Sequence, residues 1–199
     1  MDDVTSEKRR ARSDAQRNRQ RLLDAAVRVL AGSGADVAPQ AIAKEAGVGV
    51  GTLYRHFPTR EALIDAAYRS DLSRLCGAVP DLLAERRGAD ATRIWMNRFI
   101  DHAIAKRGMA TALRAAIASG QDPYAESRAL LTDAVSALLA AGAADGSMRS
   151  DLNPDDVLIG ISGVALATGE YGNREQATRL LDLLLDGLTN GVPPTKPQV

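Results

Sequence analysis

The chain has 199 residues, of which 45% are apolar and 25% are charged, a composition that is typical of globular proteins and excludes an intrinsically disordered chain. Basic and acidic residues number 25 each, yet the basic ones gather near the N-terminus, where Lys8–Arg21 holds seven of them against one acid. The single cysteine, Cys76, excludes an intrachain disulfide and a cysteine zinc cluster.

The basic cluster has two interpretations, which are an anionic partner that meets this end of the chain or a solvated tail and charged helix face. The N-terminal charges are not followed by an apolar run, so we expect no signal peptide. The longest uncharged stretch, Val157–Gly169, has 13 residues, which is too short to span a bilayer. We therefore expect a soluble, cytoplasmic protein.

Good helix formers dominate the sequence, and β-branched runs are scarce, so we expect an all-α fold. Apolar residues at steps of three and four predict an amphipathic helix over Asp14–Ala31, preceded by a basic arm over residues 1–15. Pro39 suits the first turn of a short helix that Gly47 ends. A second short helix over Val50–His56 follows before Pro58.

After Thr59, a plausible N-cap, the pattern predicts a larger helical body. Its first helix runs on from Arg60 and bends or breaks near Cys76–Pro80. Further helices are expected at Thr92–Lys106, Met109–Ser119, Tyr124–Ala140, Asp155–Thr168 and Arg174–Thr189. The pattern thus divides the chain into a domain of short helices over residues 16–58, a larger helical domain over 59–190, and a flexible tail over 191–199.

The pair of short helices between Pro39 and Phe57 has the dimensions of a helix-turn-helix. Ile42, Ala46, Val48 and Leu53 would form the apolar seam between them. Small residues at the start of the second helix would let its backbone enter a major groove. The alternative is an ordinary pair of core helices, which does not explain why Tyr54, Arg55 and His56 cluster on so short a helix.

The stretch from Ala41-Ile42-Ala43-Lys44-Glu45-Ala46-Gly47-Val48 through Gly51-Thr52-Leu53-Tyr54-Arg55-His56-Phe57 to Arg60-Glu61-Ala62-Leu63 resembles the DNA-binding region of TetR/AcrR-type transcriptional regulators. The resemblance covers about Arg17–Tyr68. It implies a three-helix head whose third helix reads DNA, and a helical body that dimerises through its last two helices and binds an effector. The C-terminal half resembles an SbtR-like subgroup.

The resemblance implies roles for individual positions. It implies that Tyr54 and His56 lie near DNA phosphates, and that Val50 and Thr52 lie near base edges or the DNA backbone. Arg60 stands where the family commonly has Lys. Two positions depart from the pattern: Gly49 replaces the usual capping Ser, and Ala38 precedes Pro39 where a capping residue is common. Since Arg55 is the only long side chain on the recognition helix, we expect shape, apolar contacts and the arm to contribute to sequence preference. The predicted DNA-contacting residues are Arg9, Arg10, Arg12, Gln40, Val50, Gly51, Thr52, Tyr54, Arg55, His56 and Arg60.

In the body, Trp95, Phe99 and His102 recur at helical spacing on one stripe, which indicates either a plain core or the wall of a ligand cavity. With Arg114 and Tyr124 they are the candidate ligand-pocket residues. The last two helices carry small residues and leucine stripes suited to a two-fold interface, although intrachain core is the alternative. The candidate interface residues are Ile161, Val164, Ala167, Leu180, Leu181, Leu184 and Leu188.

The leading hypothesis is a dimeric, sequence-specific regulator of double-stranded DNA, a repressor that a small-molecule effector releases from its operator. A second class is an enzyme, but the sequence carries no metal or hydrolase motif, and Asp155-Asp156 lie at a helix start where acids suit the dipole. A third class is a helical adaptor that has lost DNA binding, against which the intact Gly51-Thr52-Leu53-Tyr54 argues. We expect no cofactor, no bound metal and no catalytic residue.

Overall fold

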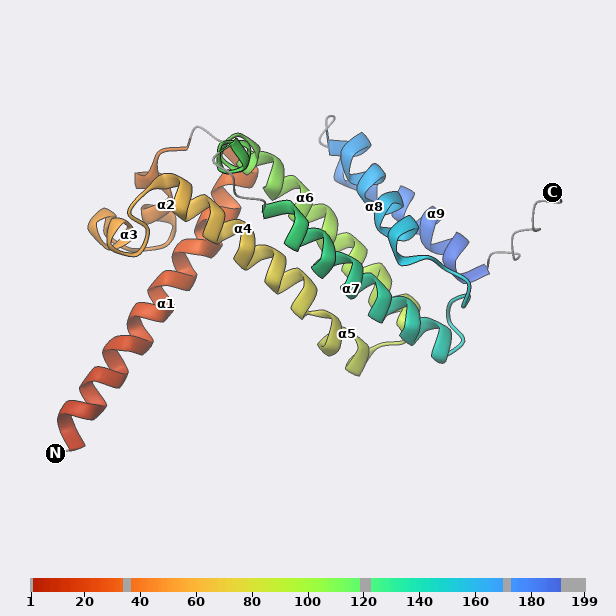
Figure 1. Ribbon diagram of the computed structural model, residues 1–199, viewed down its shortest axis with the longest axis horizontal. Coiled ribbons are helices and arrows are strands. Elements are labelled where there is room, and N and C mark those ends of the chain that lie inside the picture. Colours follow the sequence, from red (N-terminus) through yellow and green to blue (C-terminus); the bar gives the residue numbers. More distant parts are fainter. Residues whose placement is uncertain (1, 34–36, 119–122, 170–172, 191–199) are drawn as a thin grey trace. The chain divides into compact units, whose positions relative to one another are not determined.

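The computed structural model describes residues 2–33, 37–118, 123–169 and 173–190, with backbone alone at 2–13, 33, 111–112, 114–118, 123–126 and 190. Over these ranges the chain is all-α, which confirms the predicted fold class (Figure 1). The helices are α1 (Asp2–Ser33), α2 (Pro39–Glu45), α3 (Val50–His56), α4 (Arg60–Gly77), α5 (Val79–Glu85), α6 (Gly88–Ala118), α7 (Pro123–Ala144), α8 (Pro154–Gly169) and α9 (Arg174–Asn190).

The helices form two compact units. The head unit comprises residues 1–71 and 105–123, and the body unit comprises residues 72–104 and 124–199. Both α4 and α6 contribute residues to each unit. The two units are described separately below.

In the head unit, α1 packs against α2 and α3 through the apolar side predicted from its spacing (Figure 1). The buried side of α1 carries apolar residues at steps of three and four along the helix. The fully buried ones include Leu22, Leu23, Ala26 and Leu30. This stripe is the core on which the two short helices rest.

The first helix begins at Asp2, earlier than the predicted Asp14. Glu, Lys, Arg and Ala in this stretch favour helix, and neither Gly nor Pro separates it from Asp14. Asp2 and Asp3 also lie in the first turn, where acids complement the helix dipole. The basic residues predicted to form an arm are therefore part of α1.

The predicted break between two helices at Gly108 is wrong, because α6 runs continuously through that residue. A Cβ built on Gly108 would lie 2.0 Å from the carbonyl oxygen of Leu30. Glycine at this position therefore permits the backbones of α1 and α6 to approach closely, and the helix tolerates its low helix propensity. Sequence periodicity alone reads such a glycine as a helix end.

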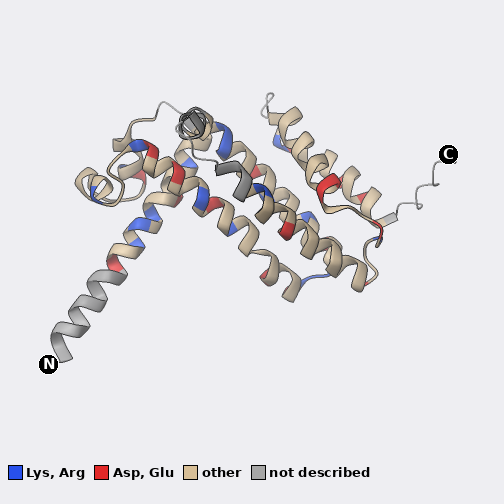
Figure 2. Cartoon of the chain, in the orientation of Figure 1, with Lys and Arg blue, Asp and Glu red and all other residues tan. Residues whose placement is uncertain are grey.

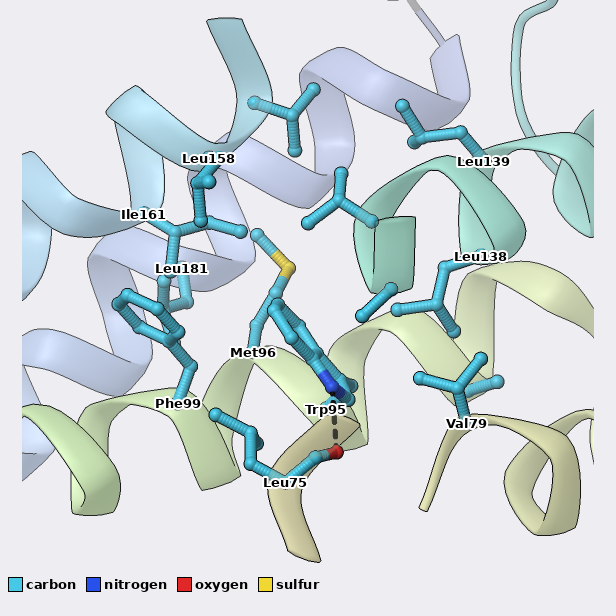
Figure 3. Close-up of a cluster of buried hydrophobic side chains, with 14 of the residues drawn as sticks. Leu75, Val79, Trp95, Met96, Phe99, Leu138, Leu139, Leu158, Ile161 and Leu181 are labelled. Atoms are coloured by element: carbon cyan, nitrogen blue, oxygen red, sulfur yellow. Dashed lines mark hydrogen bonds between the residues drawn. The ribbon is translucent and has the colours of Figure 1, made fainter. Parts of the chain in front are cut away.

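In the body unit, a hydrophobic core gathers side chains from α4 to α9 around Trp95 (Figure 3). The indole N–H of the fully buried Trp95 donates to the carbonyl oxygen of Leu75 at 3.0 Å, so its one polar atom is satisfied. Along the edge of this core, Arg174 of α9 contacts Asn97 and Asp101 of α6. These charge-assisted hydrogen bonds fix the position of α9 along α6.

Candidate nucleic-acid interface

A tight turn joins α2 to α3 and sets the geometry of the candidate site. Pro39 occupies the first turn of α2, as predicted, and Gly47 ends the turn with a φ of +68°, a conformation that favours glycine. The backbone N–H of Val48 donates to the carbonyl of Ala43 at 3.0 Å, which closes the turn. The two helices are therefore held in one crossed arrangement.

The second helix of the pair buries one side and presents the other to solvent. Leu53 is 1% exposed and packs into the head, whereas Tyr54 is 43% exposed. Gly51 and Arg55 are also exposed, and Val50, Thr52 and His56 are half-buried. On the first turn of α2, Gln40 is exposed. The residues predicted to contact DNA on these two helices thus reach solvent, and the predicted seam residue Leu53 does not.

Two glycines at the start of α3 leave its backbone accessible. A Cβ built on Gly49 or Gly51 meets no atom within 4 Å, so none of the described residues of the head covers either position. Gly49 occupies the N-cap position with φ −71° and ψ 148°, and no side chain caps the helix there. Another molecule can therefore approach the α3 backbone closely at its N-terminal turn.

The start of α4 places a cation beside this surface. The hydroxyl of Thr59 accepts a hydrogen bond from the backbone N–H of Ala62 at 3.1 Å, as expected of an N-cap residue. The next residue, Arg60, is half-buried, and its Nη2 is a buried atom with no hydrogen-bond partner in the described part of the chain. An unsatisfied buried donor costs roughly 1–3 kcal/mol, which favours any movement that brings the guanidinium to an acceptor.

Arginines follow one another along the described part of α1 (Figure 2). Arg17 pairs with Asp14 one turn away, and Arg28 pairs with Glu45 of α2 at 3.1 Å. The guanidinium of Arg19 lies over the ring of Phe57 at 5.2 Å from its centroid. Arg9, Arg10 and Arg12 lie in α1, but their side chains are outside the described residues.

The candidate pocket residues lie among the core helices of the body unit. Trp95, Phe99 and His102 are buried, and the rings of Trp95 and Phe99 lie 5.8 Å apart between centroids, with those of Phe99 and His102 6.3 Å apart. Trp95 and Phe99 belong to the hydrophobic core of the body unit. The side chains of Arg114 and Tyr124 are outside the described residues.

The candidate interface residues on α8 and α9 divide into two groups. Ile161, Leu181 and Leu188 point into the core of the same chain and are nearly fully buried (Figure 3 labels the first two). Val164, Leu180 and Leu184 are half-buried, and Ala167 is exposed.

The large exposed apolar side chains of these helices are ones that sequence reasoning missed. They are Ile159 at 59%, Leu166 at 67% and Leu183 at 68% exposed. Ile159, Gly163 and Leu166 recur at steps of four and three, which is one face of α8. This spacing was visible in the sequence, but α8 is apolar on more than one face, so periodicity could not tell which face the chain covers.

None of the helices in the described ranges is both long and apolar enough to cross a lipid bilayer. A crossed helix pair with a glycine-rich, solvent-facing second helix, flanked by cations and joined to an all-α body, defines the class of helix-turn-helix DNA-binding regulators.

Comparison with known proteins specifies the class. Residues 22–67 match the family described as bacterial regulatory proteins, tetR family, and residues 88–190 match the transcriptional regulator SbtR-like, C-terminal domain. The chain therefore belongs to the tetR family of transcriptional regulators and has an SbtR-like C-terminal domain, as the resemblance predicted.

Solved structures agree with this assignment. The TetR transcriptional regulator SCO0520 from Streptomyces coelicolor is 56% identical, with a TM-score of 0.81 over 86% of this chain and 98% of that one. The TetR transcription regulatory protein from Mycobacterium vanbaalenii is 30% identical, with a TM-score of 0.71 over 90% and 99% of the two chains.

A curated relative matches over a shorter range. The HTH-type transcriptional regulator SAR0097 of Staphylococcus aureus (strain MRSA252) is 33% identical over 99 residues, which are 47% of this chain and 51% of the relative. The match thus spans about half the length of that curated protein.

Proposed function

We propose that this chain represses transcription by binding a pseudo-palindromic operator as a homodimer, with α3 of each protomer in a major groove, and that a small-molecule effector releases it. The observation that carries the proposal is the solvent-facing side of α3, with Gly51, Tyr54 and Arg55 exposed on a helix that Leu53 anchors. Binding to DNA places its action in the cytoplasm and requires no catalytic residue, cofactor or metal.

The glycines of α3 support entry into the groove. The major groove is about 12 Å wide and admits a helix, but bulky residues at its leading turn would hold the backbone away from the base edges. Open space around Gly49 and Gly51 removes that obstacle. Val50 and Thr52 are then close enough to touch base edges, and Arg55 is long enough for a guanine.

Phosphate contacts would come from the flanks of α3. The exposed Tyr54 carries a hydroxyl donor, and Arg60 has a guanidinium nitrogen without a partner in the described residues. Such contacts fix the position of a protein on DNA and carry no base information. Arg60 would neutralise a phosphate and release condensed counterions, so affinity should fall with salt.

The exposed apolar side chains on α8 and α9 support the dimer. Ile159, Leu166 and Leu183 are large apolar side chains in solvent, and Gly163 between the first two lets a partner helix approach closely. A two-fold axis would pair this surface with itself and give the dimer two copies of α3, one for each half-site of the operator. Val164, Ala167, Leu180 and Leu184 would border the contact.

Release by an effector follows from a difference in affinity. An effector that binds better to the conformer whose two α3 helices are wrongly spaced shifts the population away from the operator-bound state. Membership of the tetR family supports this part of the proposal.

Selection from a randomised duplex pool tests the proposal. We expect the wild-type protein to enrich a pseudo-palindrome with half-sites about one helical turn apart. A Gly51→Leu variant should enrich nothing while melting no lower than the wild type, because the added side chain meets open space in the head but would collide with the groove. A wild-type protein that enriches no sequence would contradict the proposal.

A further inference from the structure

The guanidinium of Arg19 is held at the C-terminal end of the recognition helix by an aromatic ring. It lies 5.2 Å from the centroid of Phe57, within the range of a cation–π interaction. Phe57 is the residue that directly follows α3, and its backbone N–H closes the helix by donating to Leu53 at 2.8 Å. An arginine of α1 is thus tied to the end of α3, 38 positions along the chain.

The position of Arg19 on α1 explains this contact. Leu22 and Leu23, three and four residues later, are fully buried, so Arg19 continues the core-facing stripe of α1 by one more turn. At this turn the stripe reaches the rim of the head, and Arg19 itself is exposed. Its alkyl stem can cover Phe57, which is 3% exposed, while the charged head stays in water.

The other arginines of α1 with described side chains are placed differently. Arg17 and Arg28 have carboxylate partners in Asp14 and Glu45. Arg21 is exposed but follows Arg19 by two residues, which places it about 200° around the helix. Arg19 has no acidic partner within the described part of the chain, so no carboxylate of those residues neutralises its charge.

We infer that Arg19 is a further DNA-contacting residue, a phosphate clamp that the Phe57 ring holds ready beside the C-terminal end of α3. The inference rests on the proposed insertion of α3 into the major groove. Phosphates border that groove, so a helix lying in it has a DNA strand near its ends. A planar guanidinium can donate two hydrogen bonds to one phosphate.

Stacking on the ring gives the clamp its advantage over a free lysine. A flexible cation loses side-chain freedom when it binds, whereas a guanidinium that already lies on an aromatic face has lost part of it before DNA arrives. The alternative is that Arg19 only shields Phe57 from water. The two roles predict different salt dependences of DNA affinity. A phosphate contact releases counterions from DNA, whereas shielding of Phe57 releases none.

The test compares Arg19→Met with Arg21→Met by fluorescence anisotropy, on a duplex that the wild type selects and on a mixed-sequence duplex. Methionine keeps an apolar chain over Phe57 and removes the charge. For Arg19→Met we expect roughly threefold to tenfold weaker binding to both duplexes and a salt slope smaller by about 0.9 per clamp. Arg21→Met removes the same charge from the same helix, and it should change both the affinity and the salt slope less than Arg19→Met does.

The following outcomes decide the inference. Equal losses in both variants would indicate general electrostatics and overturn it, as would an Arg19→Met protein that binds like the wild type. A lower melting temperature with an unchanged salt slope would mean that Arg19 only shields Phe57. An Arg19→Lys variant, which keeps the charge without the planar fork, should keep the slope and lose part of the affinity. A wild-type protein that binds neither duplex would overturn the proposed function together with the clamp.

Discussion

Arg93 on α6 and Asp182 on α9 meet as a planar guanidinium against a carboxylate. Nε donates to one carboxylate oxygen at 2.7 Å and Nη2 to the other at 3.0 Å. The hydrogen bonds from Arg93 and its positive charge lower the pKa of Asp182 from its ordinary value of 3.8. With Arg174 and Asp101, this pair holds α9 to α6 at a second point.

The ion pair predicts a pH-dependent stability. The pKa of Asp182 is lower in the folded state than in the unfolded state. The contribution of the ion pair to the free energy of unfolding is therefore present above pH 3.8 and is lost as the pH falls through the folded pKa. Both side chains are more than a third exposed, so we expect a double-mutant coupling of only about 0.2–1 kcal/mol at neutral pH.

Thermal melts of Arg93→Met, Asp182→Asn and the double variant at neutral and at acidic pH measure this coupling. Asp186→Asn, one turn further along α9 at an exposed position, is the matched control and should change little. A coupling that persists unchanged below the folded pKa would contradict the ionic account.

The close approach of α1 and α6 predicts that Gly108→Ala destabilises the protein. The new Cβ would overlap the carbonyl oxygen of Leu30, a backbone atom that cannot rotate away, so helix shifts costing about 1–3 kcal/mol are expected. This exceeds the gain of about 1 kcal/mol that alanine brings to a helix. Denaturant titration measures the difference. Gly32→Ala, where a Cβ meets no atom within 4 Å, should not destabilise the chain, and an equally harmless Gly108→Ala would refute the close approach.

The exposed apolar side chains on α8 and α9 predict where an introduced charge will separate the proposed dimer. Leu183 is 68% exposed, whereas the neighbouring Leu184 packs against the body core, so Leu183→Glu alters the surface without disturbing folding. We expect monomers of Leu183→Glu, and of Leu166→Glu, in light scattering. Leu130→Glu, at a 41% exposed position on α7, should leave the dimer intact. Stable dimers of both α8 and α9 variants would move the interface elsewhere.

Sequence periodicity predicted the elements that depend on neighbours along the chain. The turn at Gly47, the start of α2 at Pro39 and the anchoring of α3 by Leu53 all follow from local residue preferences. Features that depend on distant residues could not be predicted in this way. Gly108 lies inside a helix because of Leu30, and Arg19 meets Phe57 only after the head has folded.

The faces of α8 illustrate a second limit. Ile161 and Ile159 are equally apolar, yet the chain covers the first and leaves the second 59% exposed. On a helix with apolar residues all around, burial depends on where the neighbouring helices lie, and composition carries no information about that. The candidate interface therefore mixed core residues with surface residues.

The central claim is that α3 and its flanking cations lie against duplex DNA. Anisotropy titration of the wild type and of Tyr54→Ala with Arg60→Ala, over a salt series on a selected and on a scrambled duplex, tests it most directly. We expect the double variant to lose affinity by a similar factor on both duplexes, with a salt slope smaller by about 0.9, because Arg60 is the one cation removed. Wild-type protein that binds neither duplex at low salt, or a loss confined to the selected sequence, would contradict the account.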